Sequence, residues 1–567
     1  MNVGERGDTP RSVTWRDAEP KPSKPYTPLM SGITPSRILL VLALFVVLGV
    51  PLALRPRTMV SATGADTPTL IIVTPHVPQI RAEFEAAFQR WHQREFGSPV
   101  AISWRVPGGT SEIIKVLEAH YRSRLAAFDF ADPANPVAVP GSTDFDLMLG
   151  GGSFDHGRLK TQVRVPRQSA RNLPASFNAD AKDIALPMSE PVGFSREELD
   201  AWFGENKIGA AQLYDPDQFW IGTALSGFGI VYNREVLSRL GLPEPQTFGD
   251  LTDPRYFGMI ALSDPRQSGS VTTTIDAILS NEGWEKGWRT LREIGANTRY
   301  YTNSSTKPPI DVSAGEAAAG LAIDFYGRGQ AQSILLPGQD PAQGRVGYVD
   351  PRGATFIDAD PVSVLRGGPN PEVSRRFIRF CLTDEAQSLW QFWSQRSGRG
   401  ALNPIGPDGK PMGPAISELR RMPVRRSMYE RYGSHMIDRV DPFTIASETK
   451  PAGWRSAIGI MMGAFAIDTA HPQRDAWRSL LAARQGVAEG TFDASVLAQM
   501  EEAFYAFPET EVDGVMVPFT PETYKAVAAT WRDPKRRPTL EMGYTQFFAA
   551  TYRRVVELGR EAGLIVN

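Results

Sequence analysis

The sequence contains glycine-rich turns whose backbone N–H groups could bind an anion. "VAISWRV" is strand-like and is followed by Gly108, Gly109, Thr110 and Ser111, after which apolar residues recur at helical spacing. Glycines and hydroxyls at a helix start present free N–H groups at the positive end of the helix dipole, which suits a carboxylate or a phosphate. The alternative is that Thr110 or Ser111 only caps the helix.

A second turn repeats this arrangement. In "FDLMLGGGSFDHGRLK" a strand is followed by Gly151 and Gly152, and a helix can begin at Ser153. Strand and helix patterns alternate from Leu70 onward, which predicts a largely parallel sheet. In open sheets of this kind ligands collect at the carboxyl ends of the strands. We therefore expect the turns "TPH", "PGGTS" and "GGGSF" to meet at one rim of the sheet.

Several other chemistries are disfavoured by the sequence. The six histidines show no HxxH or HExxH spacing, and neither a G-x-S-x-G elbow nor a Walker A motif occurs, so we expect no enzyme and no cofactor. The only cysteine, Cys381, lies on an apolar helical stripe and is expected to be buried. With 61 basic and 63 acidic residues, the net charge of -2 argues against nucleic acid as a partner.

An apolar segment near the start of the chain predicts contact with a membrane. "RILLVLALFVVLGVPLALRP" carries no charge from Ile38 to Leu54 and follows a polar tail, residues 1–36. It is interpreted as a transmembrane anchor, within 37–56, or as the core of a signal peptide cleaved after Ala62. Both interpretations place the rest of the chain on the periplasmic or extracellular side.

A set of segments in a fixed order resembles one known family. These are "IIVTPH", "GGTSEI", "FDLMLGGGSFDHGRL", "WIGTALSGFGIVYNREVL", "LSDPRQSGS", "SSTKPPIDVSAGEAAAGLAIDFYG" and "PVSVLRGGPNPEVSRRFIRFCLTDEAQ". Together they resemble the extracellular solute-binding proteins of ABC transporters, in the ferric-iron and organophosphate group with the type 2 periplasmic-binding fold. The resemblance extends from Leu70 to Met428.

The resemblance implies two α/β lobes joined by hinge strands, with a ligand between them. Lobe 1 is expected at 67–214 and again at 347–440, lobe 2 at 215–346, and a mostly helical extension at 441–567. Large side chains in helical stripes of that extension must be buried against something. We expect them to pack on lobe 1. The alternative is a separate helical module hinged at "ETKPAGW".

The resemblance also adds residues to the expected ligand site. His76 occupies about the place of a histidine ligand in iron-binding relatives, while Tyr300 and Tyr301 are interpreted as core or rim residues rather than iron ligands. "TNSSTKPP" forms the matching turn on the opposite lobe, and Asp324 binds a ligand or caps a turn. The expected ligand-binding residues are His76, Gly109, Thr110, Ser111, Gly151, Gly152, Ser226, Ser304, Ser305, Thr306, Asp324 and Tyr326.

The resemblance implies a receptor that binds a small anionic or metal-chelated solute and presents it to an ABC permease. A monomer is expected, and the sequence leaves the nature of any bound metal open. One alternative is a sensor or scaffold in the cell envelope, which the membrane anchor and the extra C-terminal helices favour. The other is an exported hydrolase on the same scaffold, although no nucleophile–base pair was found in the sequence.

Overall fold

The computed structural model describes residues 67–178, 180–336 and 339–564. The predicted anchor at 37–56 lies outside the described residues. Within the described ranges, the helices are all too short or too polar to cross a membrane.

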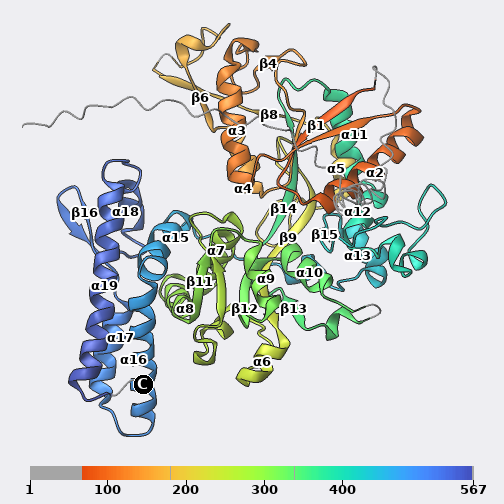
Figure 1. The fold of residues 1–567 in the computed structure, drawn as a ribbon. Helices are drawn as coiled ribbons and strands as arrows, with labels where there is room; N and C mark the ends of the chain where they lie inside the picture. The colour runs from red at the N-terminus through yellow and green to blue at the C-terminus, as the bar shows by residue number, and fades with distance from the viewer. Residues whose placement is uncertain (1–66, 179, 337–338, 565–567) are drawn as a thin grey trace, which may run out of the picture. The chain divides into compact units, whose positions relative to one another are not determined.

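A mixed sheet with two halves organises the chain (Figure 1). The first half-sheet consists of β1 (Thr69–Val73), β2 (Ala101–Arg105) and β5 (Leu147–Leu149), and β1 runs parallel to both neighbours. The second half-sheet consists of β10 (Ile260–Ser263), β11 (Thr298–Thr302) and β12 (Ala319–Ile323), where β10 is the central strand and its pairings are also parallel. This confirms the predicted α/β class.

Two long strands join the half-sheets. β9 (Ile221–Asn233) pairs with β12 through one part of its length and with β14 (Ile357–Leu365) through the other, and β14 continues to β5. All 13 residues of β9 and all nine of β14 are buried. β13 (Val346–Val349) and β15 (Met422–Pro423) also pair with β9. Polar side chains on these strands are therefore held in the interior between the half-sheets.

Helices after the strands supply the core on each side. The first half-sheet packs against α2 (Pro78–Phe96), α11 (Pro371–Cys381) and α12 (Asp384–Gln391), whose buried aromatic residues include Phe84, Phe377 and Trp390. Cys381 is fully buried in this cluster, as predicted. The second half-sheet packs against α7 (Gly269–Glu282) and α8 (Trp284–Asn297).

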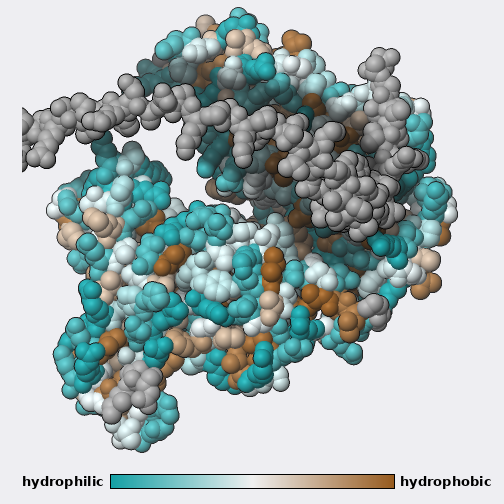
Figure 2. Space-filling model, viewed as in Figure 1, coloured by the Kyte–Doolittle hydropathy of each residue, from teal (hydrophilic) through white to brown (hydrophobic). Residues whose placement is uncertain are grey.

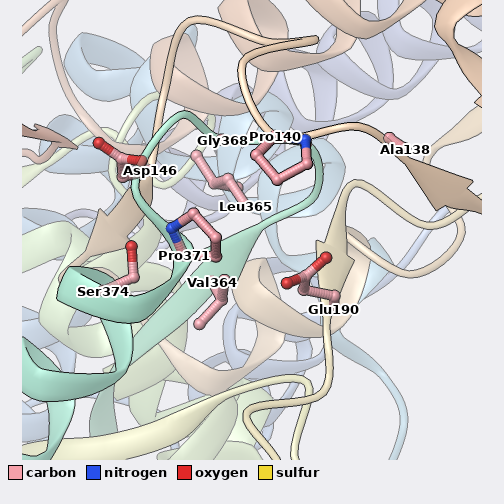
Figure 3. A pocket seen from close by; sticks show the side chains of 10 residues that line it. Ala138, Pro140, Asp146, Glu190, Val364, Leu365, Gly368, Pro371 and Ser374 are labelled. Atoms are coloured by element: carbon pink, nitrogen blue, oxygen red, sulfur yellow. The ribbon is translucent and has the colours of Figure 1, made fainter.

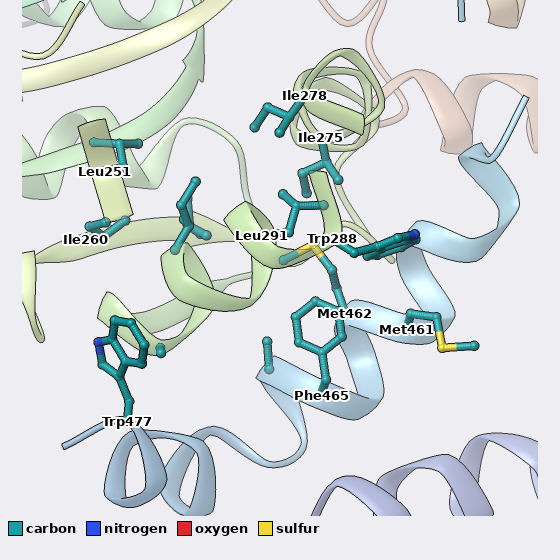
Figure 4. Packing of buried hydrophobic residues seen from close by; sticks show 14 of the residues in the cluster. Leu251, Ile260, Ile275, Ile278, Trp288, Leu291, Met461, Met462, Phe465 and Trp477 are labelled. Carbon is teal, nitrogen blue, oxygen red and sulfur yellow. The ribbon is translucent and has the colours of Figure 1, made fainter. Parts of the chain in front are cut away.

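The C-terminal helices pack on α7 and α8, so the predicted docking on lobe 1 was wrong (Figure 4). Ile275, Trp288 and Leu291 share one hydrophobic cluster with Phe465 and Trp477. The helices that follow residue 454 are α15 (Arg455–Met462), α16 (Ala470–Ala488), α17 (Ala494–Tyr505), α18 (Tyr524–Thr530) and α19 (Arg537–Glu561). An apolar stripe shows that a helix face is buried but carries no information about its partner, which explains the error.

A buried arginine on α8 is in direct contact with the C-terminal helices. Arg292, on α8, is 1% exposed, and its Nη1 donates to the carbonyl oxygen of Phe504, 2.6 Å away. Its guanidinium lies 4.5–4.8 Å from the ring centroids of Phe465, Phe507 and Phe548. The C-terminal helices thus complete the second half's core. On the face shown in Figure 2, hydrophobic residues are scattered among hydrophilic ones, in keeping with apolar stripes turned inward.

Candidate functional site

Three predicted segments lie directly after parallel strands of the first half-sheet. His76 follows β1, Gly109 and Thr110 follow β2 at the start of α3 (Thr110–Ser123), and the glycine turn follows β5 at the start of α4 (Ser153–Arg158). A Cβ built on Gly151 would lie 2.7 Å from Thr110 Cγ2, so these two turns touch. The N-cap residue of α3 is Gly109, and neither Thr110 nor Ser111 caps the helix. The plain capping alternative is therefore wrong.

A buried ion pair lies at the centre of the site. Arg421 Nη1 is 2.6 Å from Asp360 Oδ2 on β14, and the two side chains are 3% and 1% exposed. His76 Nε2 lies 2.9 Å from Asp360 Oδ2 and 2.9 Å from Arg421 Nη1. Arg421 also donates to the hydroxyl of Ser226 on β9, one of the residues predicted to bind the ligand. Burial favours the neutral acid, but Arg421, His76 and His156 together outweigh it and lower the pKa of Asp360.

The glycine turn gives its N–H groups to carboxylates of the chain itself. Gly151 N–H donates to Asp360 Oδ1 at 2.8 Å, and Ser153 N–H donates to Asp358 Oδ2 at 3.0 Å. A Cβ on Gly152 would lie 3.0 Å from Asp358 Oδ2. An incoming anion would therefore have to compete with two aspartates for these donors.

The second half contributes the start of α10 (Asp324–Ser333), which follows β12. The guanidinium of Arg421 lies 4.4 Å from the ring centroid of Phe325, and the Phe325 and Tyr326 ring centroids are 4.2 Å apart. Burial raises the pKa of Tyr326, and the nearby charge of Arg421 opposes that rise. The phenol therefore stays a neutral hydroxyl that can donate a hydrogen bond close to Arg421.

Asp324 belongs to an adjoining charge network. It is fully buried, its Oδ2 is 3.4 Å from Arg328 Nη1, and Arg328 also pairs with Asp350. Burial raises the pKa of Asp324 to about 7, although Arg328 opposes this shift. At Asp438 burial acts in the same direction, but the charges of Arg420 and Arg328 outweigh it and lower the pKa to about 2. Asp324 thus belongs to a buried network of ion pairs around Arg328.

The predicted Ser304–Thr306 turn lies at the carboxyl end of β11. Ser304 Oγ is 2.8 Å from Thr306 Oγ1, and the Ser304 carbonyl oxygen accepts from Ser263 Oγ at 3.1 Å. Ser305 is half-buried. Among the hydrogen bonds of the described residues, none links this turn to His76, Asp360 or Arg421. The turns after β1, β2 and β5 are in contact with one another, and this turn has no hydrogen bond to them among the described residues.

The tyrosines rejected as iron ligands are held by the core. Tyr300 donates to Asp311, and Tyr301 is packed against the large cluster of the second half. In the ranges that the structure describes, no group of three His, Cys, Asp or Glu side chains is placed to hold a metal ion.

Arg421, Asp360 and Asp358 were missed by sequence reasoning. The available signal was the strand "IDADPVSVL", where two aspartates alternate within an otherwise apolar run that reads as buried. A charged side chain in such a strand requires a partner of opposite charge. The partner, in "SELRRMPV", comes from a segment with no strand-like pattern of its own and could not be assigned.

One small cavity near the first half-sheet is structural (Figure 3). Its volume is about 60 Å³, and Asp146 and Glu190 line it. Asp146 accepts hydrogen bonds from the backbone N–H groups of Ile71 and Asn370, so its carboxylate joins β1 to the start of α11. A space of this size holds a few water molecules and no larger solute.

A family model and several curated proteins match parts of this chain. Residues 200–397 match the family model described as bacterial extracellular solute-binding protein. The phosphoglycerate transport regulatory protein PgtC of Salmonella typhimurium is 26% identical over 188 residues, covering 33% of this chain and 44% of that protein. Iron uptake protein A1 of Synechocystis is 29% identical over 190 residues, covering 31% and 49%. The chain spans about half the length of these curated relatives.

Solved structures include more distant neighbours. The periplasmic binding protein AfuA from Actinobacillus pleuropneumoniae, with fructose-6-phosphate bound, is 19% identical and covers 57% of this chain and 81% of its own, with a TM-score of 0.40. The ferric binding protein from Campylobacter jejuni is 14% identical and covers 69% and 95%, with a TM-score of 0.42.

Over residues 200–397 this chain is similar to the bacterial extracellular solute-binding proteins. The predicted resemblance is confirmed there, over a shorter range than 70–428. The matching family is one of extracellular binding proteins.

Proposed function

We propose that this chain is the solute-binding receptor of an ABC importer. In this proposal residues 67–214 and 347–440 form lobe 1, residues 215–346 form lobe 2, and β9 and β14 are the hinge strands. The observation that carries the proposal is the convergence on Arg421 of His76 from the first half, Ser226 and Asp360 from the joining strands, and Phe325 from the second half. A group that contacts all of these parts can report whether the lobes are open or closed.

The proposed ligand is a small anionic or metal-chelated solute. Arg421 supplies a buried positive charge, and its Nε has no hydrogen-bond partner among the described residues. Charge-assisted hydrogen bonds to a carboxylate or phosphate are roughly twice as strong as neutral ones. Tyr326 and Thr110 add neutral donors. The names of the relatives, which refer to phosphoglycerate transport and iron uptake, support both solute classes.

Binding would work through a shift between open and closed lobes. A ligand that contacts both lobes stabilises the closed state by its differential affinity for that state. The proposal needs no covalent step. The predicted anchor would keep the receptor, a monomer in this proposal, at the membrane beside its permease.

Binding can be tested by calorimetry with 3-phosphoglycerate, fructose 6-phosphate, inorganic phosphate and ferric citrate. The test variant is Arg421→Met with Asp360→Asn, because removing both charges avoids an isolated buried carboxylate. The matched control is Arg553→Met, since Arg553 is exposed on α19. We expect at least one probe to bind the native chain and the control, and to bind the double variant at least tenfold more weakly. Equal binding by the double variant, or the absence of binding by all probes, would contradict the proposal.

A sensor is a second candidate, favoured by the segment between residues 446 and 455. Ser447 O accepts from Ala210 N–H of the first half at 2.9 Å, and Ser447 Oγ donates to Asn281 on α7 at 2.7 Å. This segment continues into the C-terminal helices, so a movement of the lobes would reach them. Permease and ATPase genes beside this one would favour transport, and their consistent absence across genomes would favour sensing.

A further inference from the structure

The cavity between α4, the hinge strands, α7 and the segment 446–455 has features that the proposed function does not use. Its volume is about 400 Å³. That is within the usual range of small-molecule sites, about 300–1,000 Å³. It is lined by aromatic side chains from three parts of the chain, Phe154 on α4, Trp220 before β9 and Phe356 before β14. Ala277 and Pro451 add further apolar surface. The walls suit a flat or elongated apolar body.

Two aspartates in the wall each have one carboxylate oxygen without a hydrogen-bond donor among the described residues. Asp276, on α7, is 9% exposed, and Asp358, on β14, is 6% exposed. In each, Oδ1 is buried with no hydrogen-bond partner in the part of the chain that the structure describes. Buried polar atoms are nearly always paired, so unpaired carboxylate oxygens in two residues that line one cavity indicate missing donors. Two residues that share this defect in one cavity point to a ligand that carries donors.

The basic residue in the wall is already engaged. Arg455 is the one basic residue among the described lining residues. Its Nη1 donates to Thr273 Oγ1 at 3.1 Å and lies 3.8 Å from Asp276 Oδ2, while its guanidinium covers the ring of Phe154 at 5.4 Å. Arg455 lies near Asp276, and no ion pair of the described residues includes Asp358, so two carboxylates against one guanidinium give the lining an excess of negative charge. An anion would be repelled, whereas an ammonium group would supply the donors.

We propose that this cavity binds a small organic cation, an ammonium or guanidinium group on an apolar or aromatic body. The cationic group would donate to Asp276 and Asp358, and the apolar body would pack on Phe154, Trp220 and Phe356. Aromatic faces attract such a cation as well as its apolar body. This site is separate from the anion proposed at Arg421 and goes beyond that proposal.

The segment 446–455 would close one wall of this site. Its Ala452 N–H donates to Ser280 Oγ on α7 at 3.0 Å, and Lys207 of the first half pairs with Glu448 at 2.8 Å. Arg455, the first residue of α15, brings the same wall into contact with the C-terminal helices. The site is thus built from both halves and from the extension.

The test uses three probes of similar shape on the full chain: 2-phenylethylamine, 2-phenylethanol and 3-phenylpropionate. We expect saturation-transfer NMR and calorimetry to show binding of the amine, at least tenfold weaker binding of the alcohol, and no binding of the carboxylate. Asp276→Asn should weaken amine binding at least tenfold. Asp358→Asn, the second variant, should act in the same direction. Arg455→Met should leave amine binding equal or tighter. Asn retains the shape of Asp without the buried charge, and unfolding curves would check that both variants fold.

Three results would overturn the inference. Equal binding of alcohol and amine would show an apolar pocket only. Preferred binding of the carboxylate, abolished in Arg455→Met, would show an anion site. Amine binding that is absent in the native chain, or insensitive to both aspartate variants, would remove the site altogether. Failure here is distinguishable from failure of the proposed function, because that function is tested by anionic probes and by the Arg421→Met, Asp360→Asn variant.

Discussion

Arg421 and Asp360 form an ion pair at 2.6 Å, buried on both sides, between the joining strand β14 and the segment before β15. Taking two charges out of water costs free energy that their attraction only partly returns, so such a pair contributes little net stability. Its effect is to fix Arg421 in one position beside His76 and Ser226. In the proposed function, the pair positions a charge for binding.

The first prediction compares the loss of the whole Arg421–Asp360 pair with the loss of one partner. Arg421→Met alone leaves the Asp360 carboxylate buried beside His76, so the free energy of unfolding should fall by about 3–5 kcal/mol. Adding Asp360→Asn should restore a large part of that loss, because no isolated charge is left. Urea unfolding of the native protein, the two single variants and the double variant gives a double-mutant cycle. If the double variant loses the sum of the two single losses, the two side chains are not coupled.

The second prediction concerns pH. The pKa of Asp324 is raised to about 7 in the folded protein, against about 3.9 when unfolded. The unfolded chain releases this proton first, so the contribution to stability is full below pH 4 and is lost as pH rises through about 7. Asp324→Asn removes this loss. Between pH 5 and pH 8 we expect the free energy of unfolding of the variant to exceed that of the native protein by about 1–3 kcal/mol, measured by urea unfolding. A difference that does not change with pH would refute the raised pKa.

The third prediction concerns the C-terminal helices. Truncation after Asp441 would expose Trp288, Leu291 and Ile275, which are at most 1% exposed in the complete chain. Such a surface drives association, so we expect the truncated protein to aggregate or to melt well below the complete one. Size-exclusion chromatography and thermal unfolding check this. A soluble monomer with the native melting temperature would show that these helices form an independent module.

The fourth prediction addresses the hydroxyls. Thr110→Ala with Ser305→Ala should weaken binding of the anionic solute by about 1–3 kcal/mol for each hydrogen bond removed. Thr110 does not cap α3, so thermal stability without ligand should stay native. Calorimetry on the single variants assigns the effect. Because Ser305 has no described hydrogen bond to the Arg421 cluster, an effect from Ser305→Ala would show that lobe closure brings the turns together.

Much of the fold could be predicted because it depends on local patterns. The alternation of strand and helix from Leu70 reflects period-two and period-3.6 burial, and a parallel sheet places every strand's carboxyl end on one side. His76, Gly109 and Gly151 could therefore be expected at one rim, where the structure places them. The order of the family-like segments extended the prediction to the second half of the sheet.

The rest depends on contacts between residues far apart in the chain. Asp360 and Arg421 meet through tertiary structure alone, and the glycine turn looked free because its acceptors, Asp358 and Asp360, lie more than 200 residues away. The partner of the C-terminal helices was unreadable for a similar reason. α8 packs Trp288 beside Phe465 and Arg292 beside Phe504 of the extension, while its last residue, Asn297, donates to Leu251 of its own half. Its sequence alone cannot show that two layers cover it.

Native mass spectrometry of the full-length chain, purified from the membrane or exported fraction, tests the central claim of solute capture most directly. We predict an added mass that corresponds to one small acidic or metal-chelated solute per chain. It should persist in Arg553→Met and disappear in the Arg421→Met, Asp360→Asn variant. A chain that carries no added mass and gains none from any probe of the anionic panel would contradict the account, as would an added mass retained by the double variant.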